Sequence, residues 1–183
     1  MTITNTEIQG CFIIEPKVFE DARGYFFESY SKNVWQNSTG TKINFVQDNE
    51  SFSSKGVLRG LHLQTGEYEQ AKLVRVIKGK ILDVAVDVRP NSETFGKHIS
   101  IILSGENKKQ LFIPRGFAHG FLVLQDNTIF SYKCDNFYNK ESESGIIYND
   151  ATLNIDWGFP EDKLIISDKD KKLPTFNSFV NAN

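Results

Sequence analysis

His62 stands in a short stretch that combines apolar, strand-forming residues with fixed positive charge. The stretch reads Val57-Leu58-Arg59-Gly60-Leu61-His62-Leu63-Gln64, and Lys72 and Arg75 follow shortly after it. The chain has only three histidines, and histidine is the side chain whose ordinary pKa suits proton transfer near neutrality. The stretch is therefore where we look for acid–base chemistry. From the residues alone, a core histidine that hydrogen-bonds a backbone group is the favoured interpretation.

A metal site is a second kind of chemistry that His62 could support. Jelly-roll proteins often hold a metal through a His-x-His pair and a carboxylate, but the position two after His62 is Gln64. The remaining histidines, His98 and His119, are isolated, so no ligand spacing is present. We therefore expect no metal site.

Lys72 and Tyr132 are the next candidates, because both fall on strand faces shared with apolar residues. Lys72 shares a face with Val74 and Val76, and Tyr132 lies on the Phe130 side of its strand. Facing the interior, a lysine and a tyrosine would be costly unless paired or used. His119 lies on a turn that enters a strand, Ile113-Pro114-Arg115-Gly116-Phe117-Ala118-His119-Gly120-Phe121, where a purely structural turn is the alternative.

Short strands are the elements that must position these side chains. Alternation and turn signals predict strands over 11–15, 25–30, 45–53, 73–77, 81–89, 99–103, 110–113, 121–125, 128–134 and 164–168, with a short helix over 31–35. Two hairpins are expected, about Lys78-Gly79-Lys80 and across Asp126-Asn127. In 45–53 neither face is apolar, so Gln47 and Asn49 would suit an inner wall that holds a polar ligand. The pattern predicts an all-β antiparallel sandwich or jelly roll with a few short helices.

Composition limits the class of protein. At 183 residues the chain is most simply one domain, residues 1–183, with 39% hydrophobic and 24% charged residues. The 21 basic and 23 acidic residues leave a net charge of −2, so no global basic field indicates nucleic acid or a membrane surface. Two cysteines, Cys11 and Cys134, are too few for a disulfide scaffold. With no signal peptide or membrane-length apolar run, we expect a cytoplasmic protein.

The order and spacing of seven short landmarks identify a family. The chain resembles dTDP-4-dehydrorhamnose 3,5-epimerases and related sugar-nucleotide epimerases, and the resemblance covers about residues 8 to 176. The landmarks are Asp21-Ala22-Arg23-Gly24-Tyr25-Phe26-Phe27-Glu28, Gln47-Asp48-Asn49-Glu50-Ser51, Gly56-Val57-Leu58-Arg59-Gly60-Leu61-His62, Lys72-Leu73-Val74, Asp83-Val84-Ala85-Val86-Asp87-Val88-Arg89, Ile113-Pro114-Arg115-Gly116-Phe117-Ala118-His119-Gly120-Phe121 and Ser167-Asp168-Lys169-Asp170.

The resemblance implies a cupin-type jelly roll, a homodimer, and no metal or redox cofactor. It implies a dTDP-4-keto-6-deoxy sugar as substrate, inverted at C3 and C5 through enolates on the way to dTDP-L-rhamnose. By position, His62 would be the base and Asp168 the carboxylate that orients it. Lys72 would stabilise the enolate, and Tyr132 would deliver a proton from the opposite face.

The resemblance also assigns substrate contacts. Arg59 and His119 would contact phosphate or sugar. Four further residues match family positions near the nucleotide, and some of them would cross the dimer: Arg23, Glu28, Gln47 and Asn49. Strict alternation puts Arg59 and His62 on opposite faces, so either Gly60 marks a bulge or the two act from different walls.

Three alternatives remain open. An epimerase acting at one carbon would keep the same base and acid, and product stereochemistry would separate it. A metal-dependent cupin oxygenase or isomerase is disfavoured by the missing ligand pattern. A non-catalytic nucleotide-sugar-binding cupin would be expected to lose His62, Lys72 or Tyr132, and all three are present.

Overall fold

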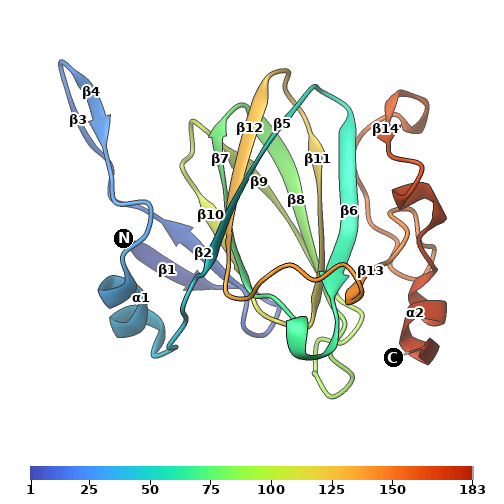
Figure 1. Ribbon diagram of the computed structural model, residues 1–183. Coiled ribbons are helices and arrows are strands. Elements are labelled where there is room, and N and C mark those ends of the chain that lie inside the picture. The colour runs from blue at the N-terminus through green and yellow to red at the C-terminus, as the bar shows by residue number, and fades with distance from the viewer. Residues whose placement is uncertain (183) are drawn as a thin grey trace.

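Two facing β-sheets form the body of the protein (Figure 1). The computed structural model describes residues 1–182, which contain fourteen strands and two α-helices. The predicted all-β sandwich with a few short helices is therefore confirmed.

The first sheet has the strand order β1-β2-β10-β7-β12-β5, and all its pairs are antiparallel. Its strands are β1 (Thr2–Asn5), β2 (Phe12–Glu15), β10 (Gln110–Ile113), β7 (Lys72–Lys78), β12 (Thr128–Cys134) and β5 (Gln47–Ser53).

The second sheet has the order β13-β6-β11-β8-β9, and β14 pairs with β6 in parallel. Its strands are β13 (Glu143–Gly145), β6 (Val57–Gln64), β11 (Phe117–Val123), β8 (Lys80–Asp87), β9 (His98–Ser104) and β14 (Ile165–Ile166).

An apolar core fills part of the space between the sheets. Both sheets contribute, with Val74, Val76 and Phe130 from the first and Ile81, Ala85, Phe117 and Phe121 from the second. A second cluster covers the outer face of the second sheet, where Phe176 and Phe179 of α2 (Phe176–Ala182) pack with Leu61, Val84 and Val86. The C-terminal segment thus lies beside β6, at the end of the molecule opposite the hairpin of β3 (Phe19–Asp21) and β4 (Gly24–Phe26) (Figure 1). Buried apolar area of this kind is the main stabilising contribution to the fold.

Both predicted hairpins are wrong, although most strand positions are right. β7 pairs with β10 and β12, whereas its successor β8 pairs with β9 and β11 in the other sheet. The chain likewise changes sheets between β11 and β12. Each tight turn therefore carries the chain from one sheet to the other. This crossing lets a residue of β7 or β12 face one of β6 or β8.

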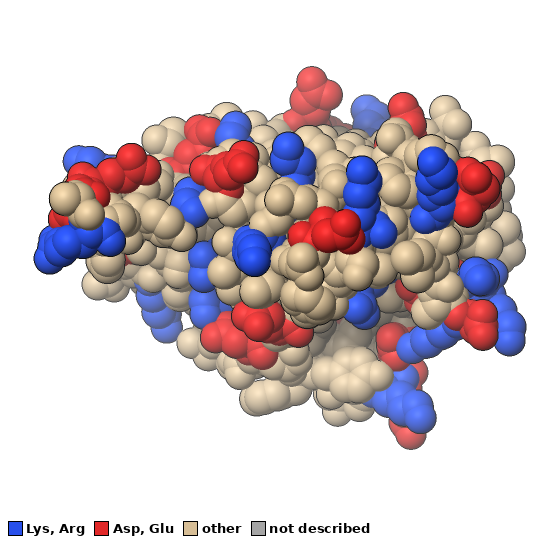
Figure 2. Space-filling model, turned by 90° about the horizontal axis from the view of Figure 1, so that it is seen from above, with Lys and Arg blue, Asp and Glu red and all other residues tan. Residues whose placement is uncertain are grey.

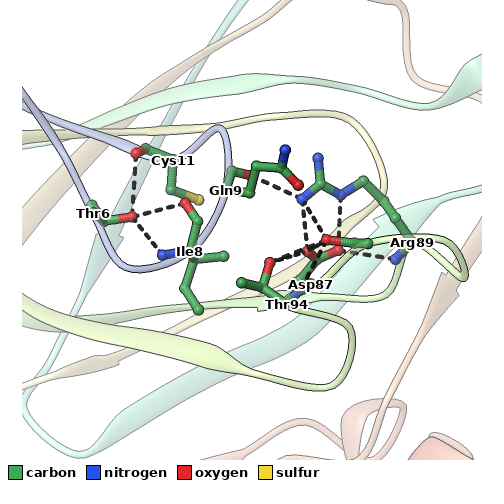
Figure 3. A network of polar contacts seen from close by, with 8 residues as sticks. Thr6, Ile8, Gln9, Cys11, Asp87, Arg89 and Thr94 are labelled. Atoms are coloured by element: carbon green, nitrogen blue, oxygen red, sulfur yellow. Dashed lines mark hydrogen bonds and ion pairs between the residues drawn. The ribbon is translucent and has the colours of Figure 1, made fainter.

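β8 is buried on both faces, which its alternating sequence does not suggest. Asp83 and Asp87 are both 0% exposed. Asp87 accepts hydrogen bonds from Arg89, Ser92 and Thr94, and Arg89 also donates to the carbonyl of Gln9 (Figure 3). This network ties the end of β8 to the loop between β1 and β2, because Arg89 binds both Asp87 and the carbonyl of Gln9. It also gives the buried Asp87 carboxylate the hydrogen-bond donors that it needs.

A hairpin of β3 (Phe19–Asp21) and β4 (Gly24–Phe26) projects from the body (Figure 1). The predicted strand 25–30 is therefore shorter than expected. Phe19, Tyr25 and Phe26 are 52, 57 and 66% exposed. The predicted helix is longer than expected, because α1 (Lys32–Thr39) continues past Trp35 to a left-handed Gly40.

Charges of both signs are interspersed over the face seen in Figure 2. This face shows no field of one sign of the kind that attracts nucleic acid. Among residues 1–182, none of the helices has the length and apolar character needed to cross a membrane.

Candidate active site

A cavity of about 520 Å³ opens between the two sheets. Both walls contribute polar side chains to it. The residues that line it are Ser51, Val57, Leu58, Arg59, His62, Lys72, His119, Phe121, Phe130, Tyr132, Ile165, Ile166, Ser167 and Asp170. The structure therefore brings His62, Lys72, Tyr132, Arg59 and His119 together, as the sequence predicts.

A β-bulge at Gly60 explains how Arg59 and His62 share this cavity. Opposite β11, Arg59 pairs with Phe121 and His62 with His119, so the register shifts by one residue between them. Gly60 has φ +124, and a Cβ there would lie 2.5 Å from the Cα of Gly120. Only glycine fits such a close approach of two backbones. Of the two alternatives left open by the sequence, the structure shows the bulge, and it turns both side chains to one wall.

The carboxylate beside His62 is Asp170, and the prediction of Asp168 is wrong. His62 Nε2 lies 2.8 Å from Asp170 Oδ1, and the backbone N–H of Gly60 donates to Asp170 Oδ2 at 3.2 Å. The Asp168 side chain is 92% exposed and faces Lys171 at 3.8 Å. Asp170 opens the 3₁₀ turn η3 (Asp170–Lys172), and this turn directs it inward while Asp168 points to solvent.

Asp170 remains ionised in this position. Burial alone would raise the pKa of Asp170, but its hydrogen bonds, first among them the one from His62, hold that pKa below its ordinary value. With Nε2 of His62 donating to this carboxylate, Nδ1 is the ring nitrogen left free to take up a proton.

Lys72 and Tyr132 enter the cavity from the first sheet, opposite His62. Neighbouring strands β7 and β12 carry them, and the Lys72 amine lies 6.0 Å from the centre of the Tyr132 ring. Burial raises the pKa of Tyr132, so its hydroxyl keeps its proton near neutrality. Burial lowers the pKa of Lys72. The site therefore places a proton donor on the wall opposite the histidine.

A second hollow of about 320 Å³ adjoins the first, and His62, Lys72 and Tyr132 line both. Gln47 and Asn49 line it, with Gln47 Nε2 donating to Asn49 Oδ1 at 3.0 Å. The unusual polar row of β5 thus faces a cavity, as expected from its sequence. Ser51 continues the same row and lines the main cavity, where its buried Oγ has no partner among the described residues. Period-two alternation from Gln47 would have pointed to it.

Arg59 and His119 occupy different depths of the cavity. Arg59 is exposed and donates to Ser53 Oγ at 3.3 Å. His119 is 6% exposed, and its Nε2 lies 2.9 Å from Asp83 Oδ1. Burial lowers the pKa of His119, so the ring is neutral near pH 7. The Asp83 contact was not predicted, because β8 reads as a strand with one solvent face.

Arg23 and Glu28 do not reach the cavity in the single chain. Arg23 sits at the tip of the β3–β4 hairpin, bound to Asp21 at 2.6 Å, with 90% of its side chain exposed. Glu28 is exposed on the segment that follows the hairpin. Neither residue lines the cavity of its own chain.

Within residues 1–182, no three His, Cys, Asp or Glu side chains converge as a set of metal ligands. The groups that do converge are a histidine on a carboxylate, a lysine and a tyrosine. A β-sandwich that presents these groups to one internal cavity defines a general acid–base enzyme.

Comparison with known proteins agrees with this class. The family model described as dTDP-4-dehydrorhamnose 3,5-epimerase matches residues 5–178. The Escherichia coli K12 protein named dTDP-4-dehydrorhamnose 3,5-epimerase is 51% identical over 181 residues, covering 98% of this chain and 97% of the relative. The chain belongs to the dTDP-4-dehydrorhamnose 3,5-epimerase family.

Solved structures share the fold. The crystal structure of the Elizabethkingia anophelis dTDP-4-dehydrorhamnose 3,5-epimerase is 56% identical with a TM-score of 0.94, and 97% of each chain is covered. A Legionella pneumophila dTDP-6-deoxy-D-glucose-3,5-epimerase in complex with dTDP-4-keto-L-rhamnose is 49% identical with a TM-score of 0.92, covering 96% of this chain and 93% of that one. The sandwich is therefore of the cupin-like type, as the sequence predicts.

Proposed function

We propose that this protein is an isomerase that inverts C3 and C5 of dTDP-4-dehydro-6-deoxy-D-glucose, in the formation of dTDP-L-rhamnose. The observation that carries the proposal is the placement of His62 and Tyr132 on opposite sheets, with the cavity between them. Inversion at carbon needs a base on one face of the sugar and an acid on the other. Family membership and the sugar nucleotides named for its relatives support the choice of substrate.

The 4-keto group makes this chemistry accessible. Removal of a proton from C3 or C5 leaves an enolate whose charge lies largely on the C4 oxygen. Nδ1 of His62 takes the proton, and Asp170 stabilises the imidazolium that forms. The ammonium of Lys72 stabilises the enolate oxygen, since fixed charge in a partly enclosed site acts more strongly than in water. The Tyr132 hydroxyl then protonates the carbon from the other face, and the C4 carbonyl re-forms.

The polar row of β5 and the exposed guanidinium of Arg59 suit the dTDP portion. Arg59 suits a diphosphate, because its planar fork can donate two hydrogen bonds to phosphate oxygens. Gln47 and Asn49 offer amide donors and acceptors in the adjoining hollow. His119 lies deeper, at the sugar end.

We further propose that the protein works as a cytoplasmic homodimer. Its β3–β4 hairpin would carry Arg23, and the segment that follows the hairpin would carry Glu28, to the nucleotide in the partner's cavity. The exposed aromatic residues of this hairpin support the proposal, because exposed apolar surface of this kind marks a contact site.

Incubation with the 4-keto sugar nucleotide in deuterated water tests the reaction. We expect deuterium at both C3 and C5 and a product inverted at both carbons, seen by NMR. Inversion at one carbon only would assign a single-carbon epimerase. Binding of the sugar nucleotide without exchange would assign a binding protein and overturn the proposal.

Two variants separate the base from the acid. His62→Ala should abolish exchange as well as inversion. Tyr132→Phe removes only a hydroxyl, so His62 should still exchange protons on its own face while inversion falls about 10²–10⁴-fold. Equal loss of exchange in both variants would contradict the assignment.

Subunit mixing tests the hairpin. Homodimers of His62→Ala lack the base, and homodimers of Arg23→Ala lack the arginine that reaches across. If the hairpin serves the partner, mixed dimers contain one complete cavity and regain activity. A monomeric active enzyme by light scattering would contradict the dimer.

A further inference from the structure

Asp83 is a second carboxylate inside the sandwich, and the reaction described above does not use it. Its side chain is 0% exposed. Oδ1 accepts a hydrogen bond from His119 Nε2 at 2.9 Å, while Oδ2 is buried without a hydrogen-bond partner in the part of the chain that is described. A buried carboxylate oxygen that lacks a donor is costly unless positive charge faces it.

Strand alternation shows which cation Asp83 faces. Ile81 and Ala85 belong to the core between the sheets, so Asp83, on the same face of β8, points inward as well. Lys72 points inward from the opposite sheet, because it shares its face of β7 with Val74 of the same core. His119 touches Asp83 and lines the cavity that Lys72 also lines. The Asp83 carboxylate and the Lys72 ammonium therefore both point into the space between the two sheets, one from each sheet.

His119 does not neutralise Asp83. Burial lowers the pKa of the His119 ring, and the Asp83 contact only partly opposes this. The neutral ring donates from Nε2 and keeps the carboxylate in one orientation. His119 therefore supplies no positive charge to compensate the Asp83 carboxylate.

Lys72 is a buried cation and needs an anion to stabilise its charge. Burial lowers its pKa, and the groups that oppose this are Cys134, Asp83 and Glu143. Burial raises the pKa of the Cys134 thiol to about 11, so the thiol carries no charge near neutrality. Glu143 already binds Lys169 at 2.6 Å and Tyr138 at 3.0 Å. Of these three groups, Asp83 is therefore the carboxylate to which no cation is bound among the described residues.

The remaining groups that face Lys72 do not stabilise its charge. His62 on β6 and His119 on β11 are neutral or positive, and both line the same cavity. Tyr132 on β12 keeps its proton, because burial raises its pKa. Asp170, the other carboxylate that lines this cavity, is bound by His62 and by the Gly60 N–H and is not among the groups that raise the pKa of Lys72. The protonation of Lys72 therefore depends on Asp83.

We propose that Asp83, oriented by His119, is the counter-ion that keeps Lys72 charged while leaving its ammonium hydrogens free for the substrate. Lys72 makes no ion pair within residues 1–182. Asp83 therefore acts on Lys72 by electrostatic attraction across the interior and not through a direct ion pair. A direct ion pair would occupy the hydrogens that the enolate oxygen needs. In this partly buried setting, charge still acts over several ångströms. Asp83 is thus a positioning residue, and its role rests on the proposed function of Lys72.

Asp83→Asn tests the inference, because the amide keeps the shape and the acceptor for His119 but removes the charge. On the alkaline side, kcat/KM of the wild type should fall as Lys72 loses its proton. In Asp83→Asn that fall should occur at lower pH. At pH values between the alkaline falls of the two proteins, which we call their alkaline limbs, kcat/KM of the variant should be about 10²-fold or more below that of the wild type. At lower pH, where Lys72 is charged in both proteins, the rates should approach each other. Asp83→Ser offers a smaller neutral replacement and should shift the limb in the same direction.

The second part of the test uses a variant whose side chain at position 72 keeps its positive charge at every pH. Arginine stays protonated throughout, so the alkaline fall that is due to Lys72 should be absent in Lys72→Arg, and adding Asp83→Asn should neither create nor move such a fall. Asp87→Asn is the structural control, since Asp87 is equally buried on the same strand but is held by Arg89. It should lower thermal stability without moving the limb.

Two results would overturn the inference. One is an Asp83→Asn profile lowered equally at every pH. The other is a limb that moves as far in the Lys72→Arg background. Either would leave the proposed function standing if the wild type epimerises its substrate. A wild type that binds without exchange would refute the proposed function itself.

Discussion

Replacing Asp170 by asparagine should disable His62 while leaving its position almost unchanged. The carboxylate accepts two hydrogen bonds, from His62 Nε2 at 2.8 Å and from the Gly60 N–H at 3.2 Å. An amide has one acceptor oxygen and one donor group, so it cannot serve both donors. If the oxygen stays on Gly60, the amide N–H₂ faces Nε2 and forces the proton onto Nδ1. The nitrogen that must take the substrate's proton then already carries one.

The expected loss follows from this change of tautomer. A carboxylate-to-amide change beside a catalytic histidine costs about 10⁴-fold in a well-studied triad, and we expect a kcat lowered by about 10³–10⁴-fold here. That loss equals about 4–5.5 kcal/mol of transition-state stabilisation. KM should change little, because the interaction matters only when the imidazolium forms.

Exchange of the C3 and C5 hydrogens in deuterated water measures the step directly. The matched control is Asp168→Asn, which changes the same group two residues away, where 92% of the side chain is exposed. It should remain within about threefold of the wild type, as surface substitutions usually do. Exchange within about fivefold of wild type in Asp170→Asn, or an equal loss in Asp168→Asn, would refute the geometry-based assignment.

Further predictions concern the support of the site. Gly60→Ala should lower the free energy of unfolding by more than about 3 kcal/mol and displace His62, because the Cβ of the new alanine would lie 2.5 Å from Gly120 Cα. The control is Gly24→Ala, at φ +126 with nothing within 4 Å, which should cost only backbone strain of about 1–3 kcal/mol. Denaturant titration with an activity assay compares them, and equal costs would contradict the bulge argument. Burial raises the pKa of Asp87, but its bonds from Arg89, Ser92 and Thr94 lower it to about 2, below the ordinary value of 3.8. Its contribution of about 2 kcal/mol to the free energy of unfolding should therefore be present above pH 3.8 and be lost as pH falls toward 2, and Asp87→Asn should remove that pH dependence (Figure 3). Exhaustive chelation should leave activity intact; loss of activity that zinc or iron restores would show a metal site.

The sequence predicted the strands and the cavity residues better than it predicted their neighbours. Alternation places Gln47 and Asn49 on one face, and this depends only on residues close in the chain. Asp168 and Asp170 differ only in where a 3₁₀ turn directs them. That turn is set by packing of the C-terminal segment on β6, which no local pattern encodes.

Sheet partners were mispredicted for a related reason. Gly79 and the Asp126-Asn127 pair are ordinary hairpin signals, and a tight turn looks the same whether the chain stays in one sheet or crosses to the other. The crossings also bury both faces of β8. Asp83 and Asp87 therefore became interior charges where alternation suggested solvent, and the Asp83–His119 contact could not be foreseen.

The pairing of His62 with Asp170 joins positions 108 residues apart in the chain. Asp170 belongs to the C-terminal segment, which packs on the outer face of the second sheet through β14, Phe176 and Phe179, whereas the sandwich has its own core between the sheets. Parts of a protein that pack outside its main core open at lower free energy than the whole fold. On gentle heating the protein should become inactive while its sandwich is still folded. Trp157, packed in the outer cluster, would report the opening of this segment, and Trp35, beside the first sheet, the later collapse of the sandwich.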